Sequence, residues 1–197
     1  VHFWGDGAGT YAPPGHWNDI ACEDFVKQRW SEVRWARNLA LLNASMFTAA
    51  VCCWDAKYYY YNPRPVQMNP ECKTLTGLPN FPAFTSGHST FSGAAAKFLS
   101  HVVPDQASRY MSMADEASKS RLWGGIHYRS DIEVGMAMGI ASAAGSFGQF
   151  AMLPGTQGLI QWLGWSAALL VLGLLVAFIV PFVGLLRDRP LPSHGAE

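Results

Sequence analysis

Residues 120–131 read SRLWGGIHYRSD, a stretch in which a Gly-Gly pair separates two segments of helical composition. Because glycine commonly ends helices, we expect one helix to stop at this pair and the next to carry Asp131 onward. His127 and Asp131 are four residues apart, so the carboxylate can hold one ring nitrogen and leave the other free. Arg121 adds a permanent cation suited to an oxyanion. Taken alone, the stretch equally suits a structural histidine beside a surface ion pair.

The composition of the rest of the chain indicates one helical domain with a sizeable core. Half of the 197 residues are hydrophobic, and 14 basic residues balance 14 acidic ones, so nothing suggests nucleic acid as a partner. The four cysteines show no CxxC spacing, which argues against a metal cage. We interpret the adjacent Cys52 and Cys53 as buried small hydrophobes and not as a disulfide or redox pair. No alternation with the period of a strand and no internal repeat stands out. The sequence therefore predicts an all-α fold.

Glycine, proline and capping residues give the expected organisation of the domain. Residues 1–16 are rich in glycine and proline and are expected to form a loop, and the chain looks truncated or processed because it starts with valine. Residues 17–153 are expected to form the main domain. Its predicted elements are helices at about 17–29, from the cap Ser31, from Ser86 and from the cap Asp105, with an irregular proline-rich stretch at 62–85.

The C-terminal quarter contains the longest apolar run of the chain. Residues 159–186 carry no charge and exceed the ~20 residues needed to cross a bilayer, so we expect a transmembrane helix there. Residues 154–158, PGTQG, are the expected linker, and 187–197 a polar tail. Arg187 and Arg189 follow the run, and the positive-inside rule would keep that end in the cytoplasm and the preceding domain periplasmic or extracellular. The alternative is a buried C-terminal helix.

Two further clusters interrupt the helical background. In KYYYYNPRP, Lys57 lies seven residues before Arg64; in TSGHSTF, residues Ser86, Gly87 and His88 open a helix. Free N–H groups and the helix dipole make such a helix start suitable for an anion. Each cluster alone has an ordinary explanation, as solvated charges or as a helix cap. Together with the first stretch they supply three cations, a helix start and two histidines, which suits transfer of a group from a tetrahedral oxyanion.

The three clusters in this order resemble the superfamily that joins type 2 phosphatidic acid phosphatases, bacterial acid phosphatases and vanadium-dependent haloperoxidases. The pattern is Lys-x6-Arg-Pro, then Ser-Gly-His, then Ser-Arg-x5-His-x3-Asp. One residue departs from it, because Thr85 stands where the family usually has proline. The resemblance implies a helical bundle of the acid phosphatase/haloperoxidase type for residues 17–153. The N-terminal FWGDGAGTYAPPGHWNDIA looks most like the haloperoxidase branch.

The resemblance also implies a role for each motif residue. His127 would be the phosphorylated nucleophile of a phosphatase, or the axial vanadium ligand if vanadate is bound. His88 would be the general acid or base, and Asp131 would orient His127. The oxygens of phosphate or vanadate would be bound by Lys57, Arg64, Ser86, Gly87 and Arg121.

Three functions are compatible with these residues. The first is a haloperoxidase-like enzyme with vanadate as cofactor, and with hydrogen peroxide and a halide as small-molecule partners. The alternative is a phosphatase without a cofactor, which hydrolyses a phosphate monoester or lipid phosphate through a phosphohistidine. The third is an inactive membrane-anchored binding module, which is disfavoured because every catalytic position is occupied. The N-terminal segment and the many polar residues of the motif-bearing region favour the first.

Overall fold

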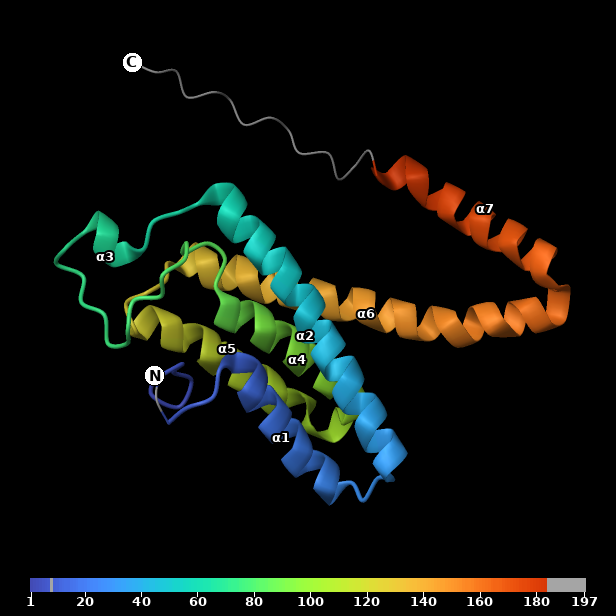
Figure 1. The fold of residues 1–197 in the computed structure, drawn as a ribbon, viewed down its shortest axis with the longest axis horizontal. Coiled ribbons are helices and arrows are strands. Elements are labelled where there is room, and N and C mark those ends of the chain that lie inside the picture. Colours follow the sequence, from blue (N-terminus) through green and yellow to red (C-terminus); the bar gives the residue numbers. More distant parts are fainter. Residues whose placement is uncertain (8, 184–197) are drawn as a thin grey trace, which may run out of the picture. The chain divides into compact units, whose positions relative to one another are not determined.

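The computed structural model describes residues 1–7 and 9–183, and the regular structure of that part of the chain is helical, without a strand (Figure 1). This confirms the predicted all-α class. The elements in chain order are α1 (Pro13–Lys27), α2 (Glu32–Tyr60), α3 (Pro65–Met68), α4 (Gly87–Val102), η1 (Pro104–Gln106), α5 (Ala107–Trp123), α6 (Arg129–Leu163) and α7 (Trp165–Val183).

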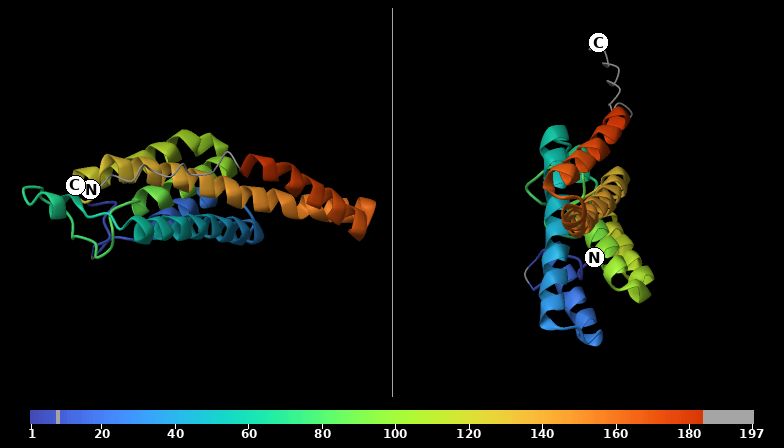
Figure 2. Two further views of the ribbon diagram at one scale, coloured as in Figure 1. Left: turned by 90° about the horizontal axis from the view of Figure 1, so that it is seen from above. Right: turned by 90° about the vertical axis from the view of Figure 1, so that its right-hand side faces the viewer.

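The chain divides into two compact units, Val1–Gln149 and Phe150–Glu197. Helix α4 is central to the first unit, because it contacts α1, α2 and α5 (Figures 1 and 2). The main core of this unit is aromatic and aliphatic, and it includes Trp4, Trp17, Phe25, Leu42, Met46, Phe98, Leu99 and Tyr110. Burial of this apolar surface is the main force that holds the helices around α4.

Local sequence accounts for most helix starts. Helix α1 begins at Pro13, earlier than expected, because proline is favoured at the first helical position. The Ser31 hydroxyl accepts a hydrogen bond from the Arg34 N–H at 3.4 Å and caps α2, as predicted. The prediction that Asp105 caps a helix is wrong. That residue lies inside the 3₁₀ turn η1, which starts at proline, and α5 follows without a side-chain cap.

Glycines bring the backbones of α4 and α6 into direct contact. A Cβ on Gly139 of α6 would lie 2.1 Å from the carbonyl oxygen of Thr90, and one on Gly93 of α4 would lie 2.7 Å from the carbonyl oxygen of Met136. Only residues without side chains permit this approach. The close contact fixes the start of α4 against the start of α6.

The predicted C-terminal organisation is wrong in two respects. Residues 154–158, expected as a linker, belong to α6, which continues with Pro154 inside it. The predicted single helix at 159–186 is broken at Gly164, whose φ of 78° is in the left-handed region that ends helices. The described part of the run is therefore divided between α6 and α7. The end of the predicted span and the tail at 187–197 lie outside the described residues.

The helix that could cross a membrane is also not the predicted one. Within the described residues, Glu32–Met68 is long and apolar enough by length and composition alone, and a third of its apolar window is buried. The C-terminal apolar stretch Trp165–Phe178 is shorter. Helix α2 contacts α4 and α1, and its side chains Leu42, Met46 and Cys53 are fully or almost fully buried.

A cluster of charges ties α1 to α5 around the buried carboxylate of Asp24. This carboxylate accepts hydrogen bonds from the Tyr110 hydroxyl at 2.8 Å, from Arg109 Nη1 at 2.5 Å and from Lys27 Nζ at 2.9 Å. Burial raises the pKa of Asp24, but the three donors outweigh burial and hold its pKa below the ordinary value. A lowered pKa stabilises the fold above the unfolded pKa of about 3.9, and the gain is lost as pH falls through the folded pKa.

We therefore expect Asp24→Asn to lower the free energy of unfolding by about 1–3 kcal/mol at neutral pH, because the three donors lose their charged partner. The difference from wild type should shrink at about pH 3, where Asp24 is already largely protonated in the unfolded state and the folded state approaches its lowered pKa. Urea titrations at the two pH values measure both effects. Asp115→Asn removes an exposed carboxylate that pairs with Lys119 and should change stability by less than about 1 kcal/mol. Equal losses in the two variants would contradict the prediction.

Candidate active site

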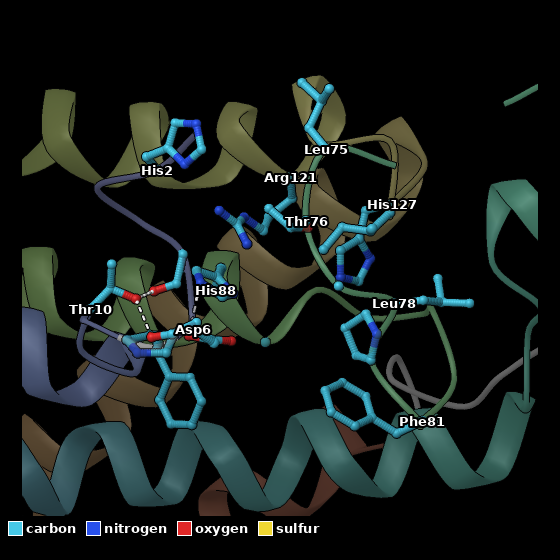
Figure 3. A pocket seen from close by; sticks show the side chains of 18 of the residues that line it. His2, Asp6, Thr10, Leu75, Thr76, Leu78, Phe81, His88, Arg121 and His127 are labelled. Carbon is cyan, nitrogen blue, oxygen red and sulfur yellow. Dashed lines mark hydrogen bonds and ion pairs between the residues drawn. The ribbon is translucent and has the colours of Figure 1, made fainter. Parts of the chain in front are cut away.

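A cavity of about 510 Å³ lies in the first unit, at the start of α4 (Figure 3). It is lined by residues 2–7 and 10–13 of the N-terminal segment, by Trp54 of α2, by residues 75–81 of the proline-rich stretch, by the start of α4 and by residues at and just after the end of α5. Of the predicted site residues, Gly87, His88, Arg121 and His127 line it. The others do not line the cavity, although Arg64 and Asp131 are bonded to His127.

Both ring nitrogens of His127 are engaged. Its Nδ1 is 2.9 Å from Asp131 Oδ2, and the same oxygen accepts the Tyr128 N–H at 3.0 Å. Its Nε2 is 3.0 Å from Arg64 Nη1, which can only donate. Nδ1 therefore carries the proton of the neutral ring, and the lone pair is on Nε2. Burial lowers the pKa of His127 to about 4, against the opposing effect of Asp131, so the ring is neutral at neutral pH. A neutral ring with its lone pair on Nε2 can act as a nucleophile or a ligand.

Carbonyl groups of the proline-rich stretch hold two of the predicted cations. Lys57 Nζ donates to the carbonyl oxygens of Pro82 at 2.7 Å and Ala83 at 3.1 Å. Arg64 donates to the carbonyl oxygens of Phe81 and Pro82 and, at 2.8 Å, to that of Ile126. Burial lowers the pKa of Lys57 to about 8 and that of Arg64 to about 10, so both remain mainly charged at neutral pH. The two cations therefore lie behind the cavity wall.

Arg121 is the predicted cation that faces the cavity directly (Figure 3). Its Nε donates to the Ser120 hydroxyl at 2.9 Å, and Nη2 is 3.5 Å from the carbonyl oxygen of Val1. Burial lowers the pKa of Arg121, partly offset by the carboxylate of Asp6. The short link to Ser120, on the same helix, fixes the guanidinium at the end of α5 with donors turned toward the cavity.

Ser86 and its neighbour Thr85 anchor the start of α4 to its surroundings. Ser86 is fully buried, and its hydroxyl accepts a hydrogen bond from the Ser89 N–H at 3.4 Å, so it caps its own helix. The Ser86 N–H donates to the carbonyl oxygen of Asp131 at 2.9 Å, which joins the start of α4 to α6. Thr85, in the position where the family usually has proline, donates its hydroxyl to Cys53 Sγ of α2 at 3.3 Å. The start of α4 is therefore hydrogen-bonded to α6 through Ser86 and to α2 through Thr85.

His88 is held by the N-terminal segment, which sequence reasoning did not connect to the site. Its Nε2 is 2.7 Å from the carbonyl oxygen of Trp4 and 3.5 Å from Asp6 Oδ1. Burial and Arg121 lower the pKa of His88 to about 3, and the Trp4 carbonyl opposes them. In the sequence, FWGDG indicated only the haloperoxidase branch and no role in the site. Its glycines were the available signal, because they let the chain fold back over a site.

The model of the PAP2 superfamily matches residues 38–154, more than half of the chain. The chain belongs to the PAP2 superfamily. This confirms the predicted family, and the matched range contains all eight predicted site residues. PAP2 proteins are phosphatases or haloperoxidases, so membership of this superfamily supports an enzyme of one of these two kinds.

Three solved structures resemble the chain. A bacterial vanadium-dependent iodoperoxidase is 29% identical, with a TM-score of 0.65 over 72% of this chain and 40% of that one. LpxE of Aquifex aeolicus is 20% identical, with a TM-score of 0.55 over 68% of this chain and 82% of that one. A transmembrane PAP2-type phosphatidylglycerolphosphate phosphatase of Bacillus subtilis is 16% identical, with a TM-score of 0.46 over 71% and 75%. No curated protein sequence matches the chain.

The donor set of the PAP2 site suits an oxyanion better than a bare metal ion. Within the described residues, no group of three or more His, Cys, Asp or Glu side chains could hold a metal ion. At and behind the cavity wall lie instead the three cations Arg121, Lys57 and Arg64, with the imidazoles of His88 and His127 and the carboxylates of Asp6 and Asp131. Such a site can neutralise the oxygens of phosphate or of vanadate.

Proposed function

We propose that this PAP2 enzyme is a vanadium-dependent haloperoxidase that uses hydrogen peroxide to oxidise a halide. The observation that carries the proposal is the N-terminal segment. Its sequence resembles the haloperoxidase branch, and it lines the cavity and holds His88 through the Trp4 carbonyl. The similarity to the iodoperoxidase supports this choice. Since the chain covers 40% of that protein, its activity is carried over here only as a proposal.

The residues of the cavity fit vanadate. Its oxygens would be bound by Arg121 and by the helix start at Gly87, with further positive charge from Lys57 and Arg64 behind the cavity wall, and the vanadium would be bound by Nε2 of His127. Arg64 Nη1 now donates to this same nitrogen, so ligation requires that contact to give way. Bound vanadate would supply the Lewis acid that activates peroxide toward a halide.

The chain's own residues would orient the reactants and move the proton. Asp131 holds the Nδ1–H of His127, which keeps the Nε2 lone pair directed away from the carboxylate. Arg121 provides fixed positive charge at the cavity. His88, neutral at neutral pH, can accept a proton from a bound peroxide or water and return it to a leaving oxygen.

The phosphatase alternative is favoured by the apolar residues that line the cavity. Trp54, Leu75, Leu78 and Phe81 give the cavity wall an apolar surface suited to the organic part of an ester. In this reaction, His88 must first be protonated; His127 Nε2 then attacks phosphorus while the ester oxygen leaves with that proton. Water then attacks the phosphohistidine, its proton passes to His88, and phosphate leaves. Both reactions use the same residues.

A membrane partner and a periplasmic or extracellular position of the catalytic domain stay predictions. Both rested on the span at 159–186, which is broken at Gly164. The length and apolar composition of Glu32–Met68, which contains α2, support association with a membrane. Fractionation of the full chain, with and without detergent, tests this: recovery in the soluble fraction without detergent would argue against it.

We expect one purified preparation, loaded with vanadate, to oxidise iodide or bromide with hydrogen peroxide and to lose this activity when phosphate is added. The reason is that the two anions share shape and charge and bind the same fixed donors. Parallel assays of halide oxidation and of phosphate-ester hydrolysis, with calorimetry of both anions, measure this. Ester hydrolysis without halide oxidation would replace the proposal by the phosphatase. Simultaneous binding of both anions without interference would contradict the single site.

A further inference from the structure

Trp4 is the residue of the N-terminal segment whose carbonyl group contacts His88. Besides being buried, its side chain makes a hydrogen bond and a ring contact to two helices. Trp4 is 1% exposed. Its indole Nε1 donates to Glu116 Oε1 of α5 at 3.1 Å. Its ring lies 5.8 Å from that of Trp17, whose own Nε1 donates to the Ser92 hydroxyl of α4 at 2.9 Å. Trp4 is thus attached to two helices of the core, although it belongs to a loop.

This attachment fixes the carbonyl group that His88 meets. A carbonyl oxygen can only accept, so the Nε2 atom of His88, 2.7 Å away, must carry the proton. The neutral ring is then the Nε2–H tautomer, and Nδ1 is its only basic atom. Without a fixed partner, the ring of His88 would exchange between its two tautomers, and the basic atom would change place.

We propose that Trp4 is a positioning residue of the active site, which fixes His88 as the Nε2–H tautomer and so assigns proton transfer to Nδ1. The charged or titratable groups that face His88 are Asp6, Arg121, His127 and His16. The positive charge of Arg121 disfavours protonation of the His88 ring. The carboxylate of Asp6 lies 3.5 Å from Nε2 of His88, but the Trp4 carbonyl oxygen, at 2.7 Å, is closer and is therefore the acceptor of the Nε2–H. The proposal rests on the assignment of His88 as the acid or base.

The test uses variants that loosen Trp4 without touching His88. Trp4→Phe keeps an aromatic ring but loses the indole N–H, and Glu116→Ala removes its acceptor from the exposed face of α5. Glu116→Gln keeps an acceptor oxygen and serves as the rescue. Asp115→Ala, at the neighbouring exposed position, is the matched control. If Trp4→Phe does not fold, Glu116→Ala carries the test by itself.

We expect nitrogen NMR of the labelled histidine to show the Nε2–H tautomer in wild type, Glu116→Gln and Asp115→Ala, and a mixture of tautomers in the two loosened variants. Turnover in those two should fall by up to about tenfold with little change in KM. The limb of the pH–rate profile that reports His88 should move to lower pH, because the carbonyl that favours the charged ring is displaced.

Two results would overturn the proposal. One is an Nδ1–H tautomer in wild type, and the other is an unchanged tautomer and pH profile in folded, loosened variants. The NMR measurement does not depend on which reaction the enzyme catalyses. Loss of the proposed haloperoxidase function would therefore leave this test intact, with ester hydrolysis as the rate to follow.

Discussion

His127→Ala should abolish turnover, with a loss of at least about a thousandfold in kcat, whichever of the two reactions the enzyme catalyses. His127 combines a lone pair on Nε2, a position on the cavity wall and a carboxylate hydrogen-bonded to its other ring nitrogen. Alanine leaves no group that could attack phosphorus or bind vanadium. Steady-state assays of halide oxidation and ester hydrolysis measure the loss, with circular dichroism to show that the variant is folded.

Asp131→Asn is the informative comparison. Asparagine keeps the size of the side chain but loses the charge that favours the Nδ1–H form, and groups that orient a ligand typically contribute about 10–100-fold. In the His127→Ala background the same change should have no further effect on rate, because the group that Asp131 orients is gone. Near-wild-type turnover in folded His127→Ala protein would refute the role of His127. Additive losses in the double variant would separate Asp131 from His127.

The parts of the site that depend on neighbours in sequence could be predicted. His127 and Asp131 were expected to meet from their spacing of four residues, and their side chains are 2.9 Å apart. Ser86 was expected at a helix start and is the N-cap of α4. The Gly-Gly pair was expected to end a helix, and α5 stops at Trp123. The Ser86 cap and the Gly-Gly end follow from local helix geometry. His127 lies just before α6 and Asp131 in its first turn, so their contact is made at a helix start and not along a helix face.

Features set by distant parts of the chain could not be predicted. The carbonyl oxygens that hold Lys57 and Arg64 belong to a stretch in which any residue type offers the same backbone group, so side-chain chemistry gives no sign of them. The contact of Trp4 with His88 joins residues 84 positions apart, also through a backbone atom. In the C-terminal run, composition indicated one long span, but Gly164 ends a helix there. A single left-handed residue outweighs apolar composition in deciding where a helix stops.

Gly139→Ala should have the largest effect on stability, although Gly139 lies outside the cavity. Its added Cβ would lie 2.1 Å from the Thr90 carbonyl oxygen and 2.9 Å from the Ala94 nitrogen, both backbone atoms that cannot rotate away. Helices α4 and α6 must then separate locally. We expect a loss of at least about 3 kcal/mol in the free energy of unfolding, the upper end of overpacking costs. For a chain of this size, the melting temperature should fall by roughly 6–12 °C.

Gly145→Ala in the same helix is the matched control, because a Cβ there meets nothing within 4 Å. It should leave stability unchanged or raise it by up to about 1 kcal/mol, since alanine is the better helix former. The folded fraction of Gly139→Ala should also turn over more slowly, because α4 carries His88 and α6 carries Asp131, and a displacement of about 1 Å can cost about 10²-fold in rate. Calorimetry of both variants, with rates corrected for the folded fraction, separates the two effects. Equal melting temperatures for the two variants would show that α4 and α6 are not held together at their backbones. In that case their contact could not be what sets the separation of the two catalytic helix starts.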